Sequence, residues 1–207
     1  MHVPPAFRNS NTAKALAFAR EFPFAALVVN GEHVPVTALV PLVYDAKTGV
    51  FLGHVARINP FWKAALATGR AAAIFRGPDA YVTPSSYLSK ARHHKAVPTW
   101  NYRALEIRGK ISVEIEPEKM ERYLSPLTEE MESRRAEPWS LSEAPKAYLS
   151  QLSRAIVGFS LSPDSSEFIE KLSQNKSEAD QQGVIRALEL SGGANDMAIA
   201  AAMRGRA

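Results

Sequence analysis

Cysteine is absent from the 207-residue chain. Without thiols there are no disulfides, no thiolate metal sites and no cysteine nucleophile, which fits the reducing cytoplasm. Long apolar runs are also scarce, and the run at residues 22–29 is too short to span a bilayer. The first residues lack the basic and apolar regions of a signal peptide. We therefore expect a cytoplasmic protein that does not enter a membrane.

Common catalytic signatures are missing as well. The chain contains no Gly-x-Gly-x-x-Gly, P-loop, Gly-x-Ser-x-Gly or His-Glu-x-x-His sequence. This argues against Rossmann, Walker, α/β-hydrolase and zincin sites. The adjacent His93 and His94 would point apart on an extended chain, which disfavours a metal site built on them.

What the chain does contain is typical of one globular domain with a substantial core. Hydrophobic residues make up 46% and charged residues 22%. The formal net charge is +4, which favours anionic ligands but is too small to establish nucleic-acid binding.

Hydrophobic periodicity and turn residues predict an α+β protein. We expect helices at 12–21, 61–68, 117–137 and 142–152, and two helices within 177–207 that are separated at 191–193. We expect strands at 24–30, 34–44, 50–55, 70–75, 80–83, 97–113 and 155–161, with 166–172 open to either assignment. Five to seven antiparallel strands with interspersed helices predict a barrel.

The strand at 97–113 is the centre of this prediction. Its two alternating sets of residues both contain large apolar groups, as expected for a strand in a barrel or at an interface. Trp100, Asn101 and Tyr102 offer aromatic faces beside amide and phenol groups, which suits the wall of a pocket. The alternative is that the two aromatic residues are core positions, the commoner role of buried aromatic side chains.

Two further clusters carry polar groups that suit an anionic ligand. A strand end at 53–60 joins a helix start and contains His54, Arg57 and Asn59, so it could bind phosphate. The alternative is an ordinary capped helix with a solvated arginine. The segment 171–176 has two lysines, a hydroxyl and two amides, which suit a phosphate or the polar edge of a heterocycle, or else form a solvated loop.

Taken together, these clusters resemble the PaiB family of FMN-binding negative transcriptional regulators. The matching pieces are Pro-x-x-Phe-Arg at 4–8, Gly-His-x-Ala-x-x-Asn-Pro at 53–60, Gly-Pro-x-Ala-Tyr-Val at 77–82, Val-Pro-Thr-Trp-Asn-Tyr at 97–102, Gly-Lys at 109–110, Ile-Val-Gly-Phe at 156–159 and Lys-Leu-Ser-Gln-Asn at 171–175. They span nearly the whole chain. Two positions depart from the expected pattern: Leu39 replaces a histidine and Ser86 replaces a tryptophan.

The resemblance implies an antiparallel split β-barrel related to pyridoxamine-phosphate oxidases, with peripheral helices and a C-terminal helical tail. It implies FMN at the interface of a homodimer and makes 166–172 a strand. We assign residues 1–176 to the FMN-binding domain and 177–207 to a helical extension of it. By analogy, the strand end at 54–59 would lie by the phosphate and ribityl chain, and the other two clusters by the ring. The implied FMN-binding residues are His54, Ala56, Arg57, Asn59, Trp100, Asn101, Lys171, Ser173, Gln174 and Asn175.

The function implied is that of a transcriptional repressor, with DNA as a further partner. The candidate phosphate contacts are Lys90, Arg92, Lys95, Arg134 and Arg135, although such charges are usually solvated. The C-terminal helix pair resembles a helix-turn-helix, but its second helix, at 195–206, is rich in Ala and Met, which is more typical of packing than of base recognition.

The alternatives are an FMN-dependent oxidoreductase of the split-barrel type, which needs no catalytic motif of its own, and a haem-handling barrel. In a haem-handling barrel, the candidate ligands are His54, His93 and His94.

Overall fold

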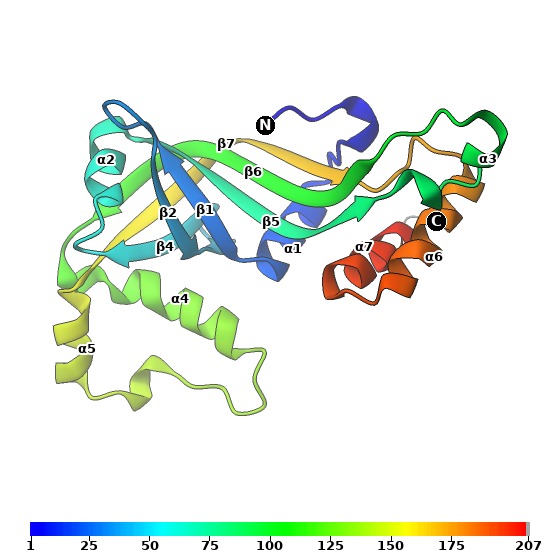
Figure 1. Cartoon of the computed structure of the whole chain (residues 1–207). Coiled ribbons are helices and arrows are strands. Elements are labelled where there is room, and N and C mark those ends of the chain that lie inside the picture. Colours follow the sequence, from blue (N-terminus) through cyan, green and yellow to red (C-terminus); the bar gives the residue numbers. More distant parts are fainter. Residues whose placement is uncertain (206–207) are drawn as a thin grey trace. The chain divides into compact units, whose positions relative to one another are not determined.

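The computed structural model describes residues 1–205, apart from the side chain of His93. The chain forms two compact units, and each is described by itself. Unit 1 comprises Met1–Asn11, Arg76–Leu105 and Glu167–Ala207, and unit 2 comprises Thr12–Phe75 and Glu106–Ser166. Figure 1 labels the elements that belong to them.

Seven strands form one sheet in the order β2-β1-β5-β6-β7-β4-β3. The strands are β1 Phe24–Val29, β2 Val36–Pro41, β3 Val43–Asp45, β4 Val50–Ala56, β5 Arg70–Val82, β6 Thr99–Glu114 and β7 Ile156–Lys171. The helices are α1 Thr12–Glu21, α2 Phe61–Thr68, α3 Lys90–His93, α4 Glu121–Glu132, α5 Lys146–Ser153, α6 Glu178–Ser191 and α7 Ala194–Arg204. The pairings of β1 with β2 and β5, and of β4 with β3 and β7, are all antiparallel.

The part of the sheet in unit 2 curls toward a barrel (Figure 1). β2 stands at one edge of the strand order and β4 is next to the other edge, yet β2 lies against β4. A flat sheet would keep them apart, so the sheet must curve to bring its two ends together. The inward side chains, among them Leu27, Phe51 and Phe75, are fully buried. The predicted α+β class with an antiparallel split barrel is confirmed.

Unit 1 has a core of its own, formed mainly by the two C-terminal helices. α6 contributes Val184, Ile185 and Leu188, and α7 contributes Ile199 and Met203. Burying each such side chain stabilises the fold by about 1.5–3 kcal/mol. The predicted break between these helices is confirmed, because α6 ends at a left-handed Gly192 with φ 70°. The last predicted residue of the second helix, Arg206, lies outside the described residues.

The predicted turn at 76–79 is wrong, because β5 runs without interruption from Arg70 to Val82. Its buried positions switch from odd numbers up to Phe75 to even numbers from Pro78 onward. A strand changes faces in this way through a local irregularity, and Gly77 and Pro78 are residues that favour one. The same residue types that indicate a turn therefore mark a kink in a longer strand.

Other predicted boundaries are close to those observed, with three exceptions. The strand predicted at 34–44 divides into β2 and β3 around Leu42. The helix predicted to reach 137 ends at Glu132. β7 continues to Lys171, so the segment left open at 166–172 lies in a strand up to that residue, as the resemblance implies.

No helix among residues 1–205 combines the length and apolar character that crossing a bilayer requires.

Glycine at two motif positions allows elements of unit 2 to approach closely. A Cβ atom on Gly109 of β6 would lie 1.8 Å from the carbonyl oxygen of Ser162 in β7. A Cβ on Gly158 would lie 2.5 Å from the ring of Tyr123 in α4. Neither approach is possible with a larger residue unless the backbone or the ring moves.

We predict that Gly109→Ala lowers the free energy of unfolding by at least about 2 kcal/mol, because the clash is with backbone atoms that cannot rotate away. Urea denaturation measures this difference. Lys110→Ala is the matched control, since Lys110 is the exposed neighbour on β6, and it should change stability by no more than about 0.5 kcal/mol. Equal stability of Gly109→Ala and the wild type would contradict the close approach of β6 and β7.

Candidate functional site

The predicted site residues of unit 1 surround a buried pair of polar side chains. Asn101 is fully buried and Ser173 is 3% exposed. The Asn101 amide donates to Ser173 Oγ at 3.0 Å, and the Ser173 hydroxyl lies 3.1 Å from Asn101 Oδ1. The same amide nitrogen lies 3.5 Å from Met203 Sδ in α7. The pair thus connects the start of β6, the segment after β7 and the last helix.

The segment at 171–176 forms a tight turn held by its own side chains. Gln174 Oε1 accepts from the N–H of Leu172 at 2.7 Å, and Gln174 Nε2 donates to the carbonyl of Glu170 at 2.6 Å. Ser173 adopts a left-handed conformation with φ 60°, which is uncommon outside glycine. Asn175 is exposed at the end of the turn. Gln174 and Ser173 therefore define the shape of the turn.

Trp100 and Tyr102 lie on the other side of β6 and line an open groove of about 370 Å³. Arg76 of β5 and Arg103 of β6 also line the groove. Trp100 is 52% exposed, and its ring meets that of Tyr81 edge to face, with centroids 5.9 Å apart. The groove therefore offers aromatic faces and cations together.

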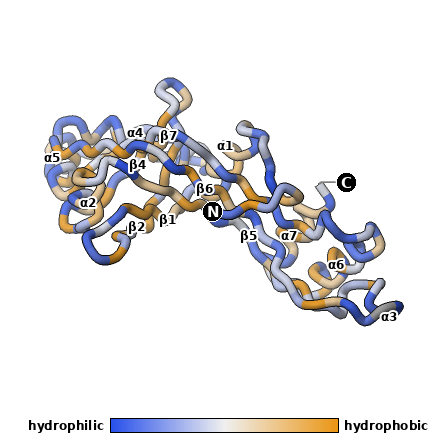
Figure 2. Tube along the Cα trace, turned by 90° about the horizontal axis from the view of Figure 1, so that it is seen from above, coloured by the Kyte–Doolittle hydropathy of each residue, from blue (hydrophilic) through white to orange (hydrophobic). Residues whose placement is uncertain are grey.

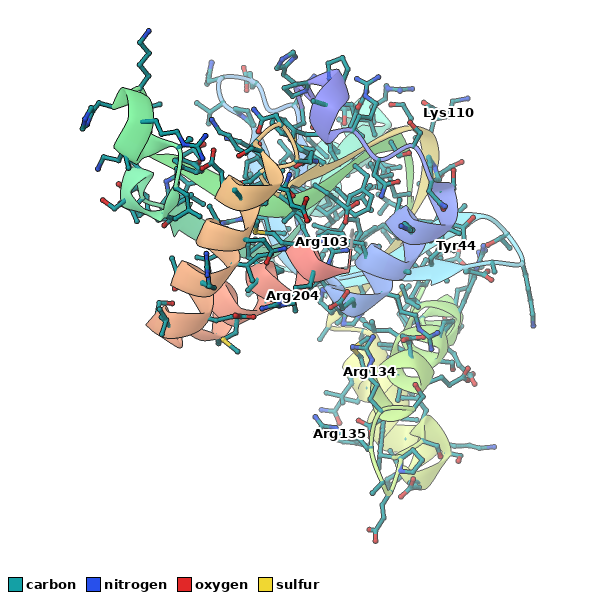
Figure 3. All side chains as sticks on the ribbon, turned by 90° about the vertical axis from the view of Figure 1, so that its right-hand side faces the viewer. Tyr44, Arg103, Lys110, Arg134, Arg135 and Arg204 are labelled. Atoms are coloured by element: carbon teal, nitrogen blue, oxygen red, sulfur yellow. The ribbon has the colours of Figure 1, made fainter. Side chains whose placement is uncertain are left out.

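Both arginines of the groove pair with carboxylates. Arg76 binds Asp79 at 2.8 Å and keeps most of its surface exposed. Arg103 binds Glu170 at 3.1 Å and is mostly buried (Figure 3). Lys171, further along β7, donates to Thr99 Oγ1 at 2.6 Å and lies 5.9 Å from the centre of the Phe7 ring. Arg76 is thus the exposed cation of the groove, whereas Arg103 and Lys171 also hold neighbouring segments.

In unit 2, Arg57 connects the ends of several elements. Its Nε donates to the carbonyl of Arg154 at 2.8 Å, and its Nη2 donates to those of Ile115 at 2.7 Å and Ile156 at 3.0 Å. The guanidinium therefore satisfies carbonyls at the end of α5, after β6 and at the start of β7. Ala56 ends β4 with an exposed side chain. Phosphate binding by Arg57 stays a prediction.

Asn59 caps the start of α2 rather than pointing freely into solvent. Its Oδ1 accepts from the N–H of Phe61 at 2.9 Å, which satisfies one of the donors that a helix leaves unpaired at its N-terminus. The indole of Trp62 donates to the carbonyl of Arg57 at 2.8 Å. For Asn59, this matches the alternative of an ordinary capped helix. The same alternative included a solvated arginine, whereas Arg57 is bound to backbone carbonyls.

His54 is the residue of this cluster with an unused polar atom. It lies in β4 opposite Gly158 of β7. Its Nδ1 is buried and has no hydrogen-bond partner within residues 1–205. Burial lowers the pKa of His54 below its usual value of 6.5, so the imidazole is neutral at pH 7. A neutral ring with a free nitrogen is suited to hydrogen bonding with a ligand.

Some of the predicted residues lie together in unit 1, and others belong to unit 2. Asn101 and Ser173 meet directly, and Trp100 and Lys171 lie on neighbouring strands of unit 1. His54, Ala56, Arg57 and Asn59 belong to unit 2. Tyr102, which the sequence placed with Trp100 as part of a pocket wall, lines the groove. The groove residues Arg76 and Arg103 were not predicted as binding residues.

The cations considered for DNA contact differ in their surroundings. Arg134, which follows α4 (Figure 3), binds the Glu130 carboxylate at 3.0 Å and the carbonyl of Arg20. Lys90 lies 3.3 Å from Ser85 Oγ. In the described part of α7, Arg204 forms two hydrogen bonds with Glu189 of α6. These contacts support packing as the role of α7.

Solved structures with the same fold include several flavin proteins. The FAD and heme binding protein from Mycobacterium smegmatis matches with a TM-score of 0.59 and 16% identity, covering 79% of this chain and 73% of that one. A conserved hypothetical protein from Mycobacterium tuberculosis matches with a TM-score of 0.60 and 12% identity, covering 86% and 95%. At this level of sequence identity, these likenesses show that the fold is shared.

Sequence comparison identifies the family. The family model described as "Putative FMN-binding domain" matches residues 1–165. The "Protease synthase and sporulation protein PAI 2" of Bacillus subtilis is 32% identical over 193 residues, covering 91% of this chain and 89% of the relative. An uncharacterized protein of Aspergillus fumigatus is 30% identical over 99% of this chain and 94% of its own length. The chain belongs to this FMN-binding family, of the PaiB type, and the predicted family and its cofactor FMN are confirmed.

We predict that Asn101→Ala lowers the free energy of unfolding by about 2–3 kcal/mol, because it leaves the buried Ser173 hydroxyl without its partner. Ser173→Ala should also lower the free energy of unfolding. The loss in the double variant should be smaller than the sum of the two single losses by at least about 0.5 kcal/mol. Thermal or urea unfolding of the four proteins measures this coupling. Asn175→Ala, on the exposed end of the same turn, should behave as the wild type. Strictly additive effects would mean that the two side chains do not interact.

We predict a loss of stability at acidic pH that depends on His54. Because the pKa of His54 is lowered in the folded state, the unfolded chain binds a proton at this residue more tightly than the folded chain does. The contribution of His54 to stability is therefore complete above about pH 6.5 and falls as the pH decreases toward the folded pKa. Urea unfolding at pH 8, 7, 6 and 5.5 should show a smaller decline for His54→Asn than for the wild type. His33→Asn is the control, since that side chain is 86% exposed. Parallel curves for His54→Asn and the wild type would contradict this.

Proposed function

We propose that the protein is an FMN-binding homodimer that acts as a transcriptional repressor of the PaiB type. The observation that carries this proposal is membership of the FMN-binding family over residues 1–165, together with the similarity to the Bacillus subtilis relative over nearly its full length. Three features of the chain support it in turn: a groove that suits a flavin, an apolar sheet face that suits a second copy, and exposed cations.

The residues of the groove in unit 1 fit a flavin. Trp100 and Tyr102 supply aromatic faces for a planar ring, and the exposed guanidinium of Arg76 supplies positive charge for an anionic tail. The groove volume of about 370 Å³ is within the usual range for ligand sites. Unit 2, considered by itself, offers the His54 Nδ1 as a hydrogen-bonding group that no described residue occupies. When bound, FMN supplies the capacity for hydride or electron transfer.

Asn101, Ser173 and Gln174 serve this site indirectly. Their hydrogen bonds are made to one another and to the backbone of the turn. Because residues alternate along a strand, fixing Asn101 toward the core turns Trp100 outward to the groove. We therefore assign these three residues a positioning role, with Trp100 and Arg76 making the contacts to flavin.

An apolar face in unit 2 supports dimerisation. β1 pairs with β2 and β5 so that Leu39, Ala26 and Ile74 form one row across the strands. These positions alternate with fully buried ones such as Leu27, so the row lies on the outer face. Leu39 is 66% exposed and Phe24, on the same face of β1, is 62% exposed. Figure 2 shows the hydrophobic character of β1. A second copy of the chain would remove this surface from water.

Repression would follow if flavin binding changed how two copies present their cations to DNA. Arg92 and Arg135 are exposed and suit phosphate contacts. The second candidate function, an FMN-dependent oxidoreductase, is supported by the open position of the groove, because a flavin bound beside the half-exposed Trp100 could be reached by a second reactant. The two functions share the flavin site and differ in their partner.

The test begins with the visible absorption spectrum of the purified protein after addition of FMN and desalting. We predict a retained flavin band in the wild type and at least a tenfold weaker affinity for FMN in Trp100→Ala, a loss of about 1.4 kcal/mol. Tyr148→Ala removes an exposed aromatic side chain on α5 and should leave the band unchanged. No retained flavin in any protein would overturn FMN binding.

The remaining parts of the proposal have separate readouts. Leu39→Asp should shift the protein from dimer to monomer in analytical ultracentrifugation, whereas Val34→Asp, an exposed apolar position outside β1 and β2, should not. Binding to DNA from the protein's own promoter region should weaken steeply with salt. If no DNA binding is detected even at low salt, and the flavin-loaded protein rapidly oxidises NAD(P)H, the repressor function is overturned and the oxidoreductase function is supported.

A further inference from the structure

A second groove, of about 490 Å³, lies within unit 2 between α4, α5 and the segments that precede them. Its apolar walls are half-buried and are formed by Leu124 of α4, Leu149 of α5 and Leu141 from the segment before α5, with Pro117 and Ala144 beside them. Figure 1 shows α4 and α5 as the two helices inserted between β6 and β7. This groove shares no residue with the one proposed for flavin.

A hydroxyl group also lines this groove. Ser153, the last residue of α5, belongs to the lining and is 8% exposed as a whole residue. Within residues 1–205, no hydrogen bond occupies its side chain. Its hydroxyl is therefore available to a polar group of a ligand.

The rim of the groove carries negative charge. Glu118 and Glu121 both line it and are exposed, and neither carboxylate forms an ion pair with another described residue. The two neighbouring basic residues are engaged elsewhere: Lys119 binds Glu116 at 2.9 Å and Glu114 at 3.3 Å, and the Arg122 guanidinium lies 5.8 Å from the centre of the Tyr123 ring. The lining contains one cation, Lys146. Two carboxylates and one ammonium leave the groove with a net negative charge.

We propose that this groove is a second ligand site, which binds a small amphiphilic cation with an aliphatic body and a single ammonium group. The leucine walls hold the aliphatic body, Glu118 and Glu121 bind the ammonium group at the rim, and Ser153 offers a hydroxyl at the floor. An anionic amphiphile would meet the two carboxylates and is rejected. The site lies on helices that join β6 to β7, and it is independent of flavin binding.

The test is titration of the isotope-labelled full-length protein with octylamine, followed by amide chemical shifts in NMR spectra. We expect saturable binding at one site, with the shifts confined to α4, α5 and the segments before them. Octanoate, of the same chain length and opposite charge, should bind at least about tenfold more weakly, because like charges face it across the rim.

Two variants and a control separate the contributions. Leu149→Trp fills the groove and should abolish binding, while the double variant Glu118→Gln and Glu121→Gln keeps the shape of the surface and should weaken octylamine binding at least about fivefold. Glu129→Gln, an exposed carboxylate on α4 outside the lining, should bind as the wild type does. Linear shifts without saturation, equal binding of octylamine and octanoate, or full binding by the double variant would each overturn the proposal.

Discussion

The buried hydrogen bonds between Asn101 and Ser173 are the constraint on which unit 1 depends. A carboxamide with no exposed surface needs partners for its donors and acceptors, and Ser173 and Met203 surround it. Satisfying the amide requires the turn after β7 to approach the start of β6, and it requires α7 to present its sulfur atom there. The left-handed conformation of Ser173 is the local strain that this approach entails.

Much of the surface chemistry of unit 1 follows from that constraint through alternation along β6. With Asn101 directed inward, Trp100 and Tyr102 face the open groove. Further along, Arg108 and Lys110 are exposed while Ile107 and Ile111 are buried, so the outer side of β6 becomes solvated. The large apolar or aromatic groups expected on both sides of the strand are therefore confined to its first half on this side.

Arg57 performs a comparable task in unit 2, and this changes the meaning of its cluster. A guanidinium that donates to three carbonyls fixes the points where α5, β6 and β7 begin or end. Three of its N–H groups are used by the backbone, and the side-chain oxygen of Asn59 also accepts from the backbone. The imidazole of His54 retains an unused nitrogen. Of the three polar residues at this strand end, His54 is the one whose chemistry remains most available to a ligand.

Sequence reasoning could recover what depends on local chemistry. Gly69 ends α2 in a left-handed conformation, and the Ser177 side chain caps α6 by accepting a hydrogen bond from the N–H of Asp180. Both signals can be read from neighbouring residues. The continuity of β5 could not, because Gly77 and Pro78 indicate a turn unless the pairing strands are known. The contacts of Arg57 with backbone carbonyls could not be predicted either. Arg154 and Ile156 lie far away in the sequence, and every residue has a backbone carbonyl, so no residue type indicates the contact.

The two departures from the family pattern illustrate the same limit. Leu39, where the resemblance led us to expect a histidine, lies half-way along an edge strand in a row with Ala26 and Ile74. A leucine at such a place enlarges an exposed apolar surface, which is unfavourable in water unless another surface covers it. Ser86 contacts α6 through its backbone: its carbonyl oxygen lies against Gly183, where a larger residue would leave no room for it. The physical role of a substitution is thus decided by the face it occupies, and the face is set by pairings that extend across the chain.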